Sequence, residues 1–324
     1  MSRTPLTDSR TDIRRIVGRH VGRHPGPTLV AVAGIHGNEP AGIEAAQRVL
    51  AELPHEDAFR GEITVLAGNT RALREGTRYV HKDLNRLWWE ERIRAMGRAG
   101  VELGDTAEDR EQKELLDSLW PLVGVADPGV PRIFLDLHTF SSPGPPFLIG
   151  SDTPGNRAFA HELHLPLIVG LQQAIGGALT EFMLPYFDIS LAVEGGTHDS
   201  ELARLHHEAI LWSSMTSAGM VDASATPRWN ELREALIWAA DDKPPVSEVI
   251  YRHTIQPEDG FRMRAGFSTF QPIQAHEELA DDRNGPVLAP YDGVLLMPLY
   301  QALGNDGFFI GREIAGSPPA AQIA

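Results

Sequence analysis

The segment 34–40, Gly-Ile-His-Gly-Asn-Glu-Pro, places an imidazole and a carboxylate three residues apart, at His36 and Glu39. The β-branched run Thr28 to Ala33 just before it predicts a buried strand, and Pro40 suits the first turn of a helix. On such a strand-to-helix turn, His36 and Glu39 can converge on one cation. The same spacing also occurs in ordinary surface loops, so this segment alone leaves both interpretations open.

A second polar group ends another apolar run. His138 follows residues Ile133 to Leu137, which predict a buried strand, and Asp136 shares its face if the strand continues. A core histidine satisfied by a hydrogen bond is the plain alternative for His138. Together with His36 and Glu39, His138 gives two imidazoles and one carboxylate at strand ends of one predicted sheet, where α/β sheets place their sites. This set predicts a catalytic zinc site with a fourth position for water.

Two further groups could act on a substrate. Glu194 ends an apolar run and could take a proton from water and pass it to a leaving nitrogen, although a salt-bridged acid explains it equally well. In the segment 77–86, Arg78 could stabilise an oxyanion, and Arg86 with Asn85 could bind a carboxylate. The alternative for this segment is a solvated, charge-rich loop.

The elements that must position these groups alternate between strand and helix. Apolar runs predict buried strands, and capping or proline signals predict helices between them. The expected strands are Thr28 to Ala33, Ile63 to Ala67, Arg132 to Leu137 and Leu191 to Glu194, and the expected helices are Pro40 to Leu53 and Thr106 to Trp120. This alternation predicts an α/β sheet with crossover connections.

The character of the chain changes near Pro245. Beyond it lie short β-branched or aromatic runs, separated by turn signals such as Asp292-Gly293 and Asp306-Gly307. One of these runs is Val287 to Met297. We therefore expect a hydrolase domain over residues 1–244 and a small β domain over residues 245–324.

Composition excludes several classes of partner. The 324 residues include 29 basic and 44 acidic side chains, a net charge of −15, which argues against nucleic acid or an anionic membrane. No stretch approaches the roughly 20 apolar residues of a membrane span. Cysteine is absent, so any metal must be held by imidazole and carboxylate, and the chain suits a reducing cytoplasm. The expected partner is a small-molecule substrate.

Together the motifs resemble a known family. Gly-Ile-His36-Gly-Asn-Glu39, Thr-Arg78-Tyr, Asp-Leu-Asn85-Arg86, Asp-Leu-His138-Thr and Val-Glu194-Gly occur in the order seen in the succinylglutamate desuccinylase/aspartoacylase family. That family belongs to the zinc carboxypeptidase-like superfamily. The resemblance implies a mixed sheet flanked by helices with a smaller C-terminal β domain and one zinc ion per chain, and it is compatible with homo-oligomers.

The resemblance also implies roles for these residues. His36, Glu39 and His138 look like the zinc ligands, and Glu194 looks like the general base and acid. Arg78 looks like the group that polarises the scissile carbonyl, whereas Asn85 and Arg86 look like the clamp on a substrate carboxylate. Family members hydrolyse N-acyl amino acids. Characterised aspartoacylases carry a further arginine shortly before the catalytic glutamate, but residues 182–186 here contain no basic side chain, which argues against N-acetylaspartate and N-succinylglutamate themselves.

The residues and the resemblance agree on a zinc-dependent hydrolase of linear amides in a carboxylate-bearing substrate. A metallocarboxypeptidase or peptide amidase could use the same zinc site. The sequence also leaves open a non-catalytic binding protein on a zinc-peptidase scaffold and a carbohydrate or lipid-acyl deacylase.

Overall fold

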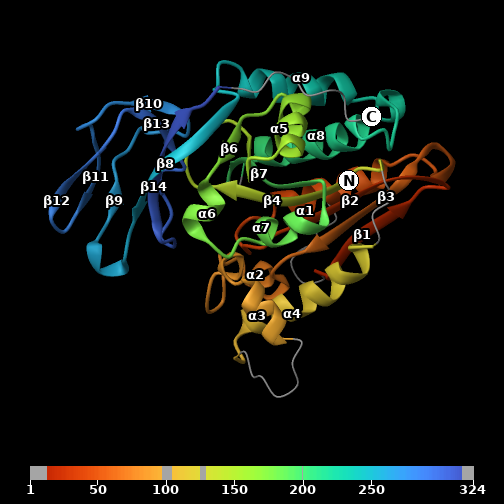
Figure 1. Ribbon diagram of the computed structural model, residues 1–324, viewed down its shortest axis with the longest axis horizontal. Helices are drawn as coiled ribbons and strands as arrows, with labels where there is room; N and C mark the ends of the chain where they lie inside the picture. The colour runs from red at the N-terminus through yellow and green to blue at the C-terminus, as the bar shows by residue number, and fades with distance from the viewer. Residues whose placement is uncertain (1–12, 97–103, 125–128, 199, 316–324) are drawn as a thin grey trace, which may run out of the picture.

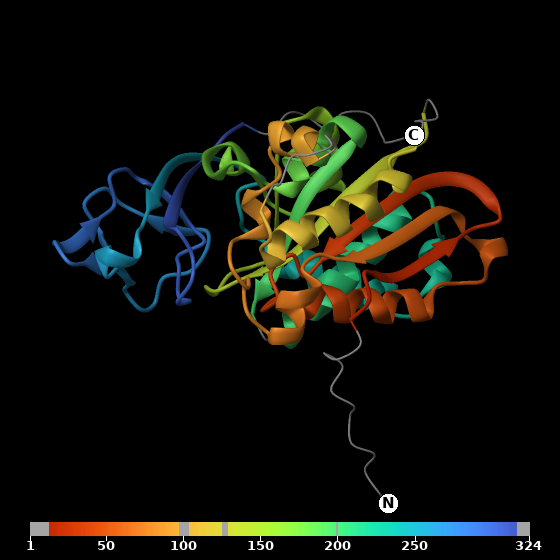
Figure 2. The same cartoon turned by 90° about the horizontal axis from the view of Figure 1, so that it is seen from below.

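One large mixed sheet with helices on both faces forms most of the protein, and a smaller antiparallel sheet lies at its C-terminal end (Figure 1). The computed structural model describes residues 13–96, 104–124, 129–198 and 200–315. Figure 2 shows the C-terminal strands projecting from one end of the helix-covered body. The predicted fold class, a mixed sheet flanked by helices with a smaller C-terminal β unit, is confirmed.

The described part of the large sheet has eleven strands in the order β1-β3-β2-β4-β7-β5-β6-β8-β14-β13-β10. In chain order these are β1 (Ile16–Val21), β2 (His24–Ala33), β3 (Arg60–Ala67), β4 (Arg132–Phe140), β5 (Phe147–Gly150), β6 (Leu167–Val169), β7 (Ile189–Thr197), β8 (Val246–Thr254), β10 (Gln271–Ile273), β13 (Gly293–Leu296) and β14 (Asp306–Glu313). The small sheet contains β9 (Arg262–Met263), β11 (Glu278–Asp282) and β12 (Gly285–Leu288). Strands β3, β2, β4 and β7 are successive parallel neighbours, so their carboxyl ends lie at the same edge of the sheet.

Helices cover both faces of this sheet (Figure 1). One face is covered by α1 (Ala41–Glu52), α5 (Pro154–Leu163), α8 (Glu201–Ser217) and α9 (Trp229–Ala240), and the other by α3 (Glu90–Met96), α4 (Ala107–Leu119) and α7 (Leu179–Met183). Two short helices, α2 (Thr70–Glu75) and α6 (Leu171–Ile175), pack against α4 and against β5 and β8 respectively.

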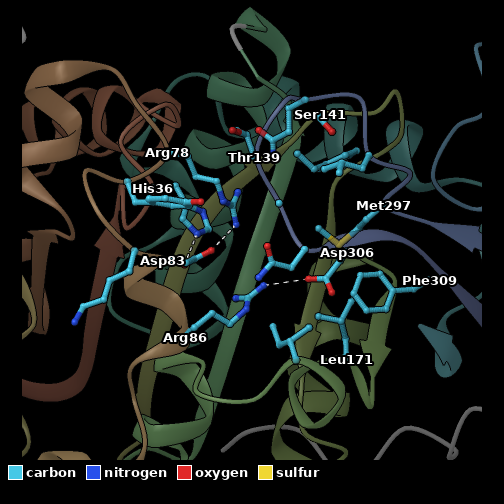
Figure 3. Close-up of a pocket in the computed structure, with 18 of the residues that line it drawn as sticks. His36, Arg78, Asp83, Arg86, Thr139, Ser141, Leu171, Met297, Asp306 and Phe309 are labelled. Atoms are coloured by element: carbon cyan, nitrogen blue, oxygen red, sulfur yellow. Dashed lines mark hydrogen bonds and ion pairs between the residues drawn. The ribbon is translucent and has the colours of Figure 1, made fainter. Parts of the chain in front are cut away.

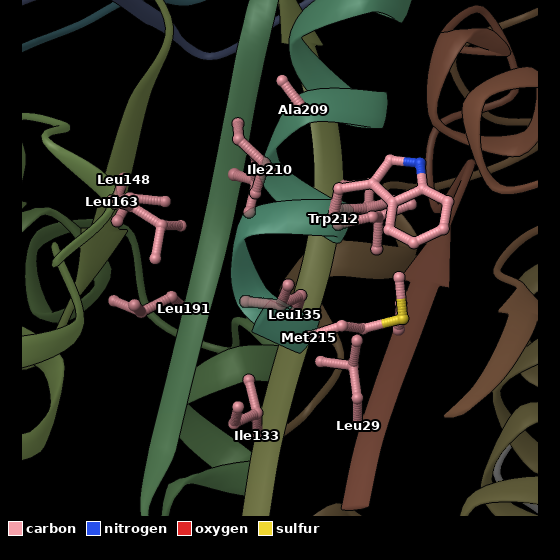
Figure 4. Close-up of a cluster of buried hydrophobic side chains, with 14 of the residues drawn as sticks. Leu29, Ile133, Leu135, Leu148, Leu163, Leu191, Ala209, Ile210, Trp212 and Met215 are labelled. Carbon is pink, nitrogen blue, oxygen red and sulfur yellow. The ribbon is translucent and has the colours of Figure 1, made fainter. Parts of the chain in front are cut away.

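The largest apolar core fixes the central strands. Leu135 of β4 and Leu191 of β7 are fully buried in one cluster with Trp212 of α8 (Figure 4). Truncating a leucine in such a core to alanine costs about 2–5 kcal/mol, because the lost contacts leave a cavity. The central strands are therefore rigid supports for the polar residues at their carboxyl ends.

The strands and helices predicted from the sequence are present, with different ends. β4 continues to Phe140 and β7 to Thr197, so His138 and Glu194 lie within strands. Pro40 is the N-cap residue of α1, and the predicted capping box of Thr106 and Asp109 begins α4. β5 was not among the predicted strands, and it runs antiparallel to its neighbour β7, as β1 does to β3.

The C-terminal strands continue the large sheet. β8, which follows residue 245, pairs in parallel with β6, which precedes it, and β14 pairs with β8. Strands from both sides of residue 245 therefore belong to one hydrogen-bonded sheet. A domain boundary at residue 245 stays a prediction. Two local expectations are wrong: Asp306-Gly307 begins β14, and the run 287–297 is divided between β12 and β13 because Asp292 lies in a turn between them. Within the described ranges, none of the helices has the length and apolar character needed to cross a membrane.

Candidate active site

His36, Glu39 and His138 meet at the carboxyl edge of the large sheet. His36 and Glu39 follow β2, and His138 lies in β4, the parallel neighbour of β2. All three are buried, and one potential ligand atom from each lies within 4.8 Å of the others. The structure thus brings together the three residues predicted as metal ligands, and they form a group that could hold a metal ion.

Two glycines allow the loop between β2 and α1 to bring His36 and Glu39 into place. Gly34 has a φ of 68°, in the left-handed region that favours glycine. A Cβ at Gly37 would lie 2.0 Å from the carbonyl carbon of Ala72, so only glycine lets the loop approach α2 this closely. The Gly37 N–H donates to the Arg78 carbonyl, which ties the metal-ligand loop to the loop that carries Arg78.

Both imidazoles turn the same nitrogen towards Glu39. His36 Nδ1 lies 2.9 Å from Glu39 Oε1, and His138 Nδ1 lies 3.1 Å from Glu39 Oε2. Each Nε2 atom faces another carboxylate, at 3.2 Å to Asp83 Oδ1 for His36 and 2.9 Å to Asp136 Oδ2 for His138. A carboxylate beside the second ring nitrogen is typical of metal-binding histidines, because it orients the ring. For His138 this contact rests on distance alone, since neither oxygen of Asp136 has a hydrogen-bond partner among the described residues.

The charges around this cluster suit a cation. Burial alone would raise the pKa of Glu39, but the two histidines hold it well below its usual value. Burial likewise opposes a charged His138, but Asp136 and Glu39 raise its pKa well above the usual value. Glu39, Asp83, Asp136 and Glu194 thus gather around two imidazoles and the guanidinium of Arg78, and Arg86 also acts on Asp83. A donor set of two imidazoles and one carboxylate, within this excess of acidic groups, fits a divalent ion.

Glu194 lies beside the cluster, with one buried carboxyl oxygen unpaired within the described part of the chain. It pairs in register with His138, because β4 and β7 are parallel neighbours. Among the described residues, no donor reaches its buried Oε2 atom. Burial, reinforced by the negative charges of Glu39 and Asp136, raises the pKa of Glu194 to about 8 even though His138 and Arg78 oppose that rise. The alternative interpretation of Glu194 as a salt-bridged acid therefore finds no partner in the described structure.

Arg78 is held close to the same cluster by Asp83. Arg78 Nη2 donates to Asp83 Oδ2 at 3.0 Å, and Arg78 Nη1 lies 3.7 Å from Glu39 Oε1. The loop after Arg78 is anchored by the fully buried Glu108 of α4, whose carboxylate accepts hydrogen bonds from the backbone N–H groups of residues 80–82. Much of the segment 77–86 thus lines the cavity, although Thr77 and His81 are exposed to solvent.

A cavity of about 330 Å³ opens beside this cluster (Figure 3). His36, Arg78, Asp83 and Arg86 line its polar side. Apolar side chains and residues from the C-terminal strands line the opposite side, among them Leu171, Ile175, Met297, Leu299, Asp306 and Phe309. The C-terminal part of the chain therefore forms one wall of the cavity.

The two residues predicted as a carboxylate clamp differ in position. Arg86 lines the cavity and lies 3.3 Å from Asp306. Asn85 is buried outside the lining, where its Oδ1 accepts a hydrogen bond from the Leu179 N–H at 2.8 Å and its Nδ2 lies 3.4 Å from His138 Nε2. Arg86 thus faces the cavity, whereas Asn85 lies in a supporting position between α7 and His138.

The segment 182–186, which lacks the arginine of aspartoacylases, does not line the cavity. Phe182 and Tyr186 instead pack against Trp120. The inference from the missing basic residue, against N-acetylaspartate and N-succinylglutamate, stays a prediction. His198, just after β7, lies near the cavity, where it contacts Thr139 and Gln301.

Sequence reasoning assigned no role to Asp83, Glu108 or Asp306. Asp83 stands inside the Asp-Leu-Asn-Arg motif, so its type and position were visible, but its bridge from His36 to Arg78 depends on the fold. Glu108 could have been noticed as an acidic residue in the first turn of α4. Nothing local marks Asp306 as a partner of Arg86, because 220 residues separate them.

The family model for the succinylglutamate desuccinylase/aspartoacylase catalytic domain matches residues 25–197. The matched region is more than half of the chain and includes every residue predicted for the site. The protein therefore belongs to the succinylglutamate desuccinylase/aspartoacylase family.

Individual relatives agree with this assignment over part of their length. Succinylglutamate desuccinylase of Serratia proteamaculans is 34% identical over 112 residues, covering 34% of this chain and 31% of that protein. The enzyme of the same name from Erwinia tasmaniensis is 31% identical over 180 residues, covering 52% of this chain and 51% of that protein. The chain thus aligns with between about a third and a half of the length of these curated relatives.

Solved structures extend the likeness over nearly the whole chain. Succinylglutamate desuccinylase from Vibrio parahaemolyticus matches with a TM-score of 0.62 at 15% identity, covering 94% of both chains. A succinylglutamate desuccinylase/aspartoacylase from Rhodobacter sphaeroides matches with a TM-score of 0.63 at 17% identity, covering 90% of this chain and 87% of that one. At such identities the likeness shows a common fold.

Proposed function

We propose that the protein is a zinc-dependent hydrolase that cleaves the amide bond of a small N-acyl amino acid. The observation that carries this proposal is the convergence of His36, Glu39 and His138, beside a cavity, with the buried Glu194, whose Oε2 has no partner among the described residues. The names of the curated relatives, which are succinylglutamate desuccinylases, support the same chemistry.

The metal is proposed to be zinc, with His36, Glu39 and His138 as its ligands and one ion per chain. Bound there, it would act as a Lewis acid on the scissile carbonyl and make water more acidic. Asp83 and Asp136 would orient the two imidazoles through their Nε2 atoms.

The remaining chemistry falls to residues of the chain. Glu194 takes a proton from the attacking water as general base and returns it to the leaving nitrogen as general acid. Arg78 directs a guanidinium at the charge that develops on the carbonyl oxygen. Arg86 binds the carboxylate of the amino acid, and Asn85 holds the turn that carries Arg86.

The shape of the cavity favours a small substrate over a peptide. Residues 297–309 close one side, and a volume of about 330 Å³ lies at the low end of the range for small-molecule sites. A metallocarboxypeptidase or peptide amidase needs an open groove for the rest of the peptide. A cytoplasmic location and a homo-oligomeric state stay predictions.

The experiment is a panel of N-acyl amino acids and short peptides incubated with zinc-loaded protein, with release of free amine as the readout. We expect turnover of at least one N-acyl amino acid and none of a peptide blocked at its amino terminus. The variant Glu194→Gln provides the inactive control. Zinc binding without release of amine from any N-acyl amino acid would refute the proposal and revive a non-catalytic binding protein.

A further inference from the structure

One acidic residue of the cavity lining, Asp306, contacts two arginines. Asp306 Oδ2 lies 3.3 Å from Arg86 Nη2 (Figure 3). Asp306 Oδ1 lies 2.6 Å from Arg252 Nε. Arg252 is itself anchored, because its Nη1 donates to the carbonyl of Ala174. The short contact to Arg252 fixes Asp306 in place and leaves the longer contact to Arg86 as the weaker of the two.

The other permanent cations of the lining are already paired. Arg78 donates to Asp83 at 3.0 Å, and Lys82 donates to Asp109 at 2.6 Å. Asp109 is shared with Arg92 and Asp306 with Arg252, and Arg86 makes the longest of the three contacts to a carboxylate, at 3.3 Å. It can turn to one carboxylate of a bound molecule while Asp306 keeps its pair with Arg252.

The wall next to Asp306 is apolar. Leu171, Ile175, Met297 and Phe309 belong to or pack against one hydrophobic cluster, and all four line the cavity. A carboxylate placed against this wall would lose its water without gaining a donor, which is costly. It would also approach the negative charge of Asp306.

We propose, resting on the function proposed above, that the cavity selects N-acyl amino acids with a single carboxylate and an apolar side chain. Arg86 holds the α-carboxylate, the side chain packs against Leu171 and Phe309, and Asp306 rejects a second carboxylate. Selectivity thus comes from repulsion by Asp306 as well as from attraction by Arg86 and the apolar wall.

The test is a binding measurement that does not need turnover. Zinc-loaded Glu194→Gln protein is titrated calorimetrically with N-acetylleucine, N-acetylmethionine and N-acetylaspartate. We expect the two apolar compounds to bind at least about tenfold more tightly, a difference of about 1.4 kcal/mol. Equal or tighter binding of N-acetylaspartate, or no binding of any of them, would overturn the inference.

Turnover by the unsubstituted protein gives an independent second readout. The ratio of kcat/KM values for N-acetylleucine and N-acetylaspartate should show the same preference. Selective binding without any hydrolysis would count against the proposed function and leave the selectivity standing. Hydrolysis with a preference for N-acetylaspartate would support the proposed function and overturn the proposed selectivity.

A pair of variants isolates the role of Asp306. Asp306→Asn removes the charge but keeps an oxygen that can accept a hydrogen bond from Arg252. The ratio of kcat/KM for N-acetylleucine to that for N-acetylaspartate, the gap between the two substrates, should therefore narrow several-fold. Asp281→Asn, which breaks a pair with Arg264 outside the cavity, is the matched control and should leave the gap unchanged. An unchanged gap in Asp306→Asn, with native-like stability, would overturn the role of Asp306.

Discussion

His138 and Glu194 face one another in register on the neighbouring parallel strands β4 and β7. Side chains at paired positions of adjacent strands project from the same side of the sheet, so an imidazole and an unpaired carboxyl group share one small space. The leucines packed beneath both strands hold this spacing. The register of two strands thus sets the distance between a proposed metal ligand and the proposed proton-transfer group.

Replacing Glu194 by Gln should abolish most turnover and leave the metal site filled. The amide cannot accept a proton from water, and general base catalysis typically contributes about 10²–10⁴-fold to a rate. We expect kcat to fall by that order while zinc content stays at the level of the unsubstituted protein. Glu201→Gln, a change at an exposed acid on α8, is the control. Full activity of Glu194→Gln would remove Glu194 from the mechanism.

The raised pKa of Glu194 also predicts a pH-dependent difference in stability in the metal-free protein. Its pKa is about 8 when folded, whereas an unperturbed glutamate has a pKa of about 4.3. Between these values the folded state keeps a proton that the unfolded state has released, so stability falls as pH rises.

Gln does not titrate, so the stability of Glu194→Gln relative to the unsubstituted protein should grow from pH 5 towards pH 8. The slope is at most about 1.4 kcal/mol per pH unit. Urea denaturation of both chelated proteins across this range measures it. A difference that stays constant with pH would show that Glu194 is not buried as a neutral acid.

Asp136→Asn should weaken zinc binding without unfolding the protein. Asp136 is fully buried and faces Nε2 of His138, so the change removes the carboxylate that orients the proposed ligand. Loss of such a partner typically lowers metal affinity about 10–100-fold. Competition with a chromophoric chelator gives the zinc dissociation constant, and circular dichroism checks the fold. An unchanged dissociation constant would mean that His138 needs no support from Asp136.

Much of the site was predictable because polar residues ended apolar runs. His36, His138 and Glu194 each follow or end a run that had to be a buried strand, and parallel strands place such ends together. The antiparallel insertion of β5 was not predictable, because its pairing with β7 is decided by tertiary packing. The pairing of Arg86 with Asp306 was not predictable either, because it depends on the tertiary packing that brings the first residue of β14 to the cavity.

Activity should depend on one metal ion held by His36, Glu39 and His138. The most direct measurement adds zinc stepwise to chelated protein and follows the rate of amine release from the best N-acyl amino acid. The rate should start near zero, rise linearly and level off near one equivalent of zinc per chain, and the variant His138→Ala should show no such rise. Full activity before zinc is added, or an unaltered titration in His138→Ala, would show that hydrolysis does not run through this metal site.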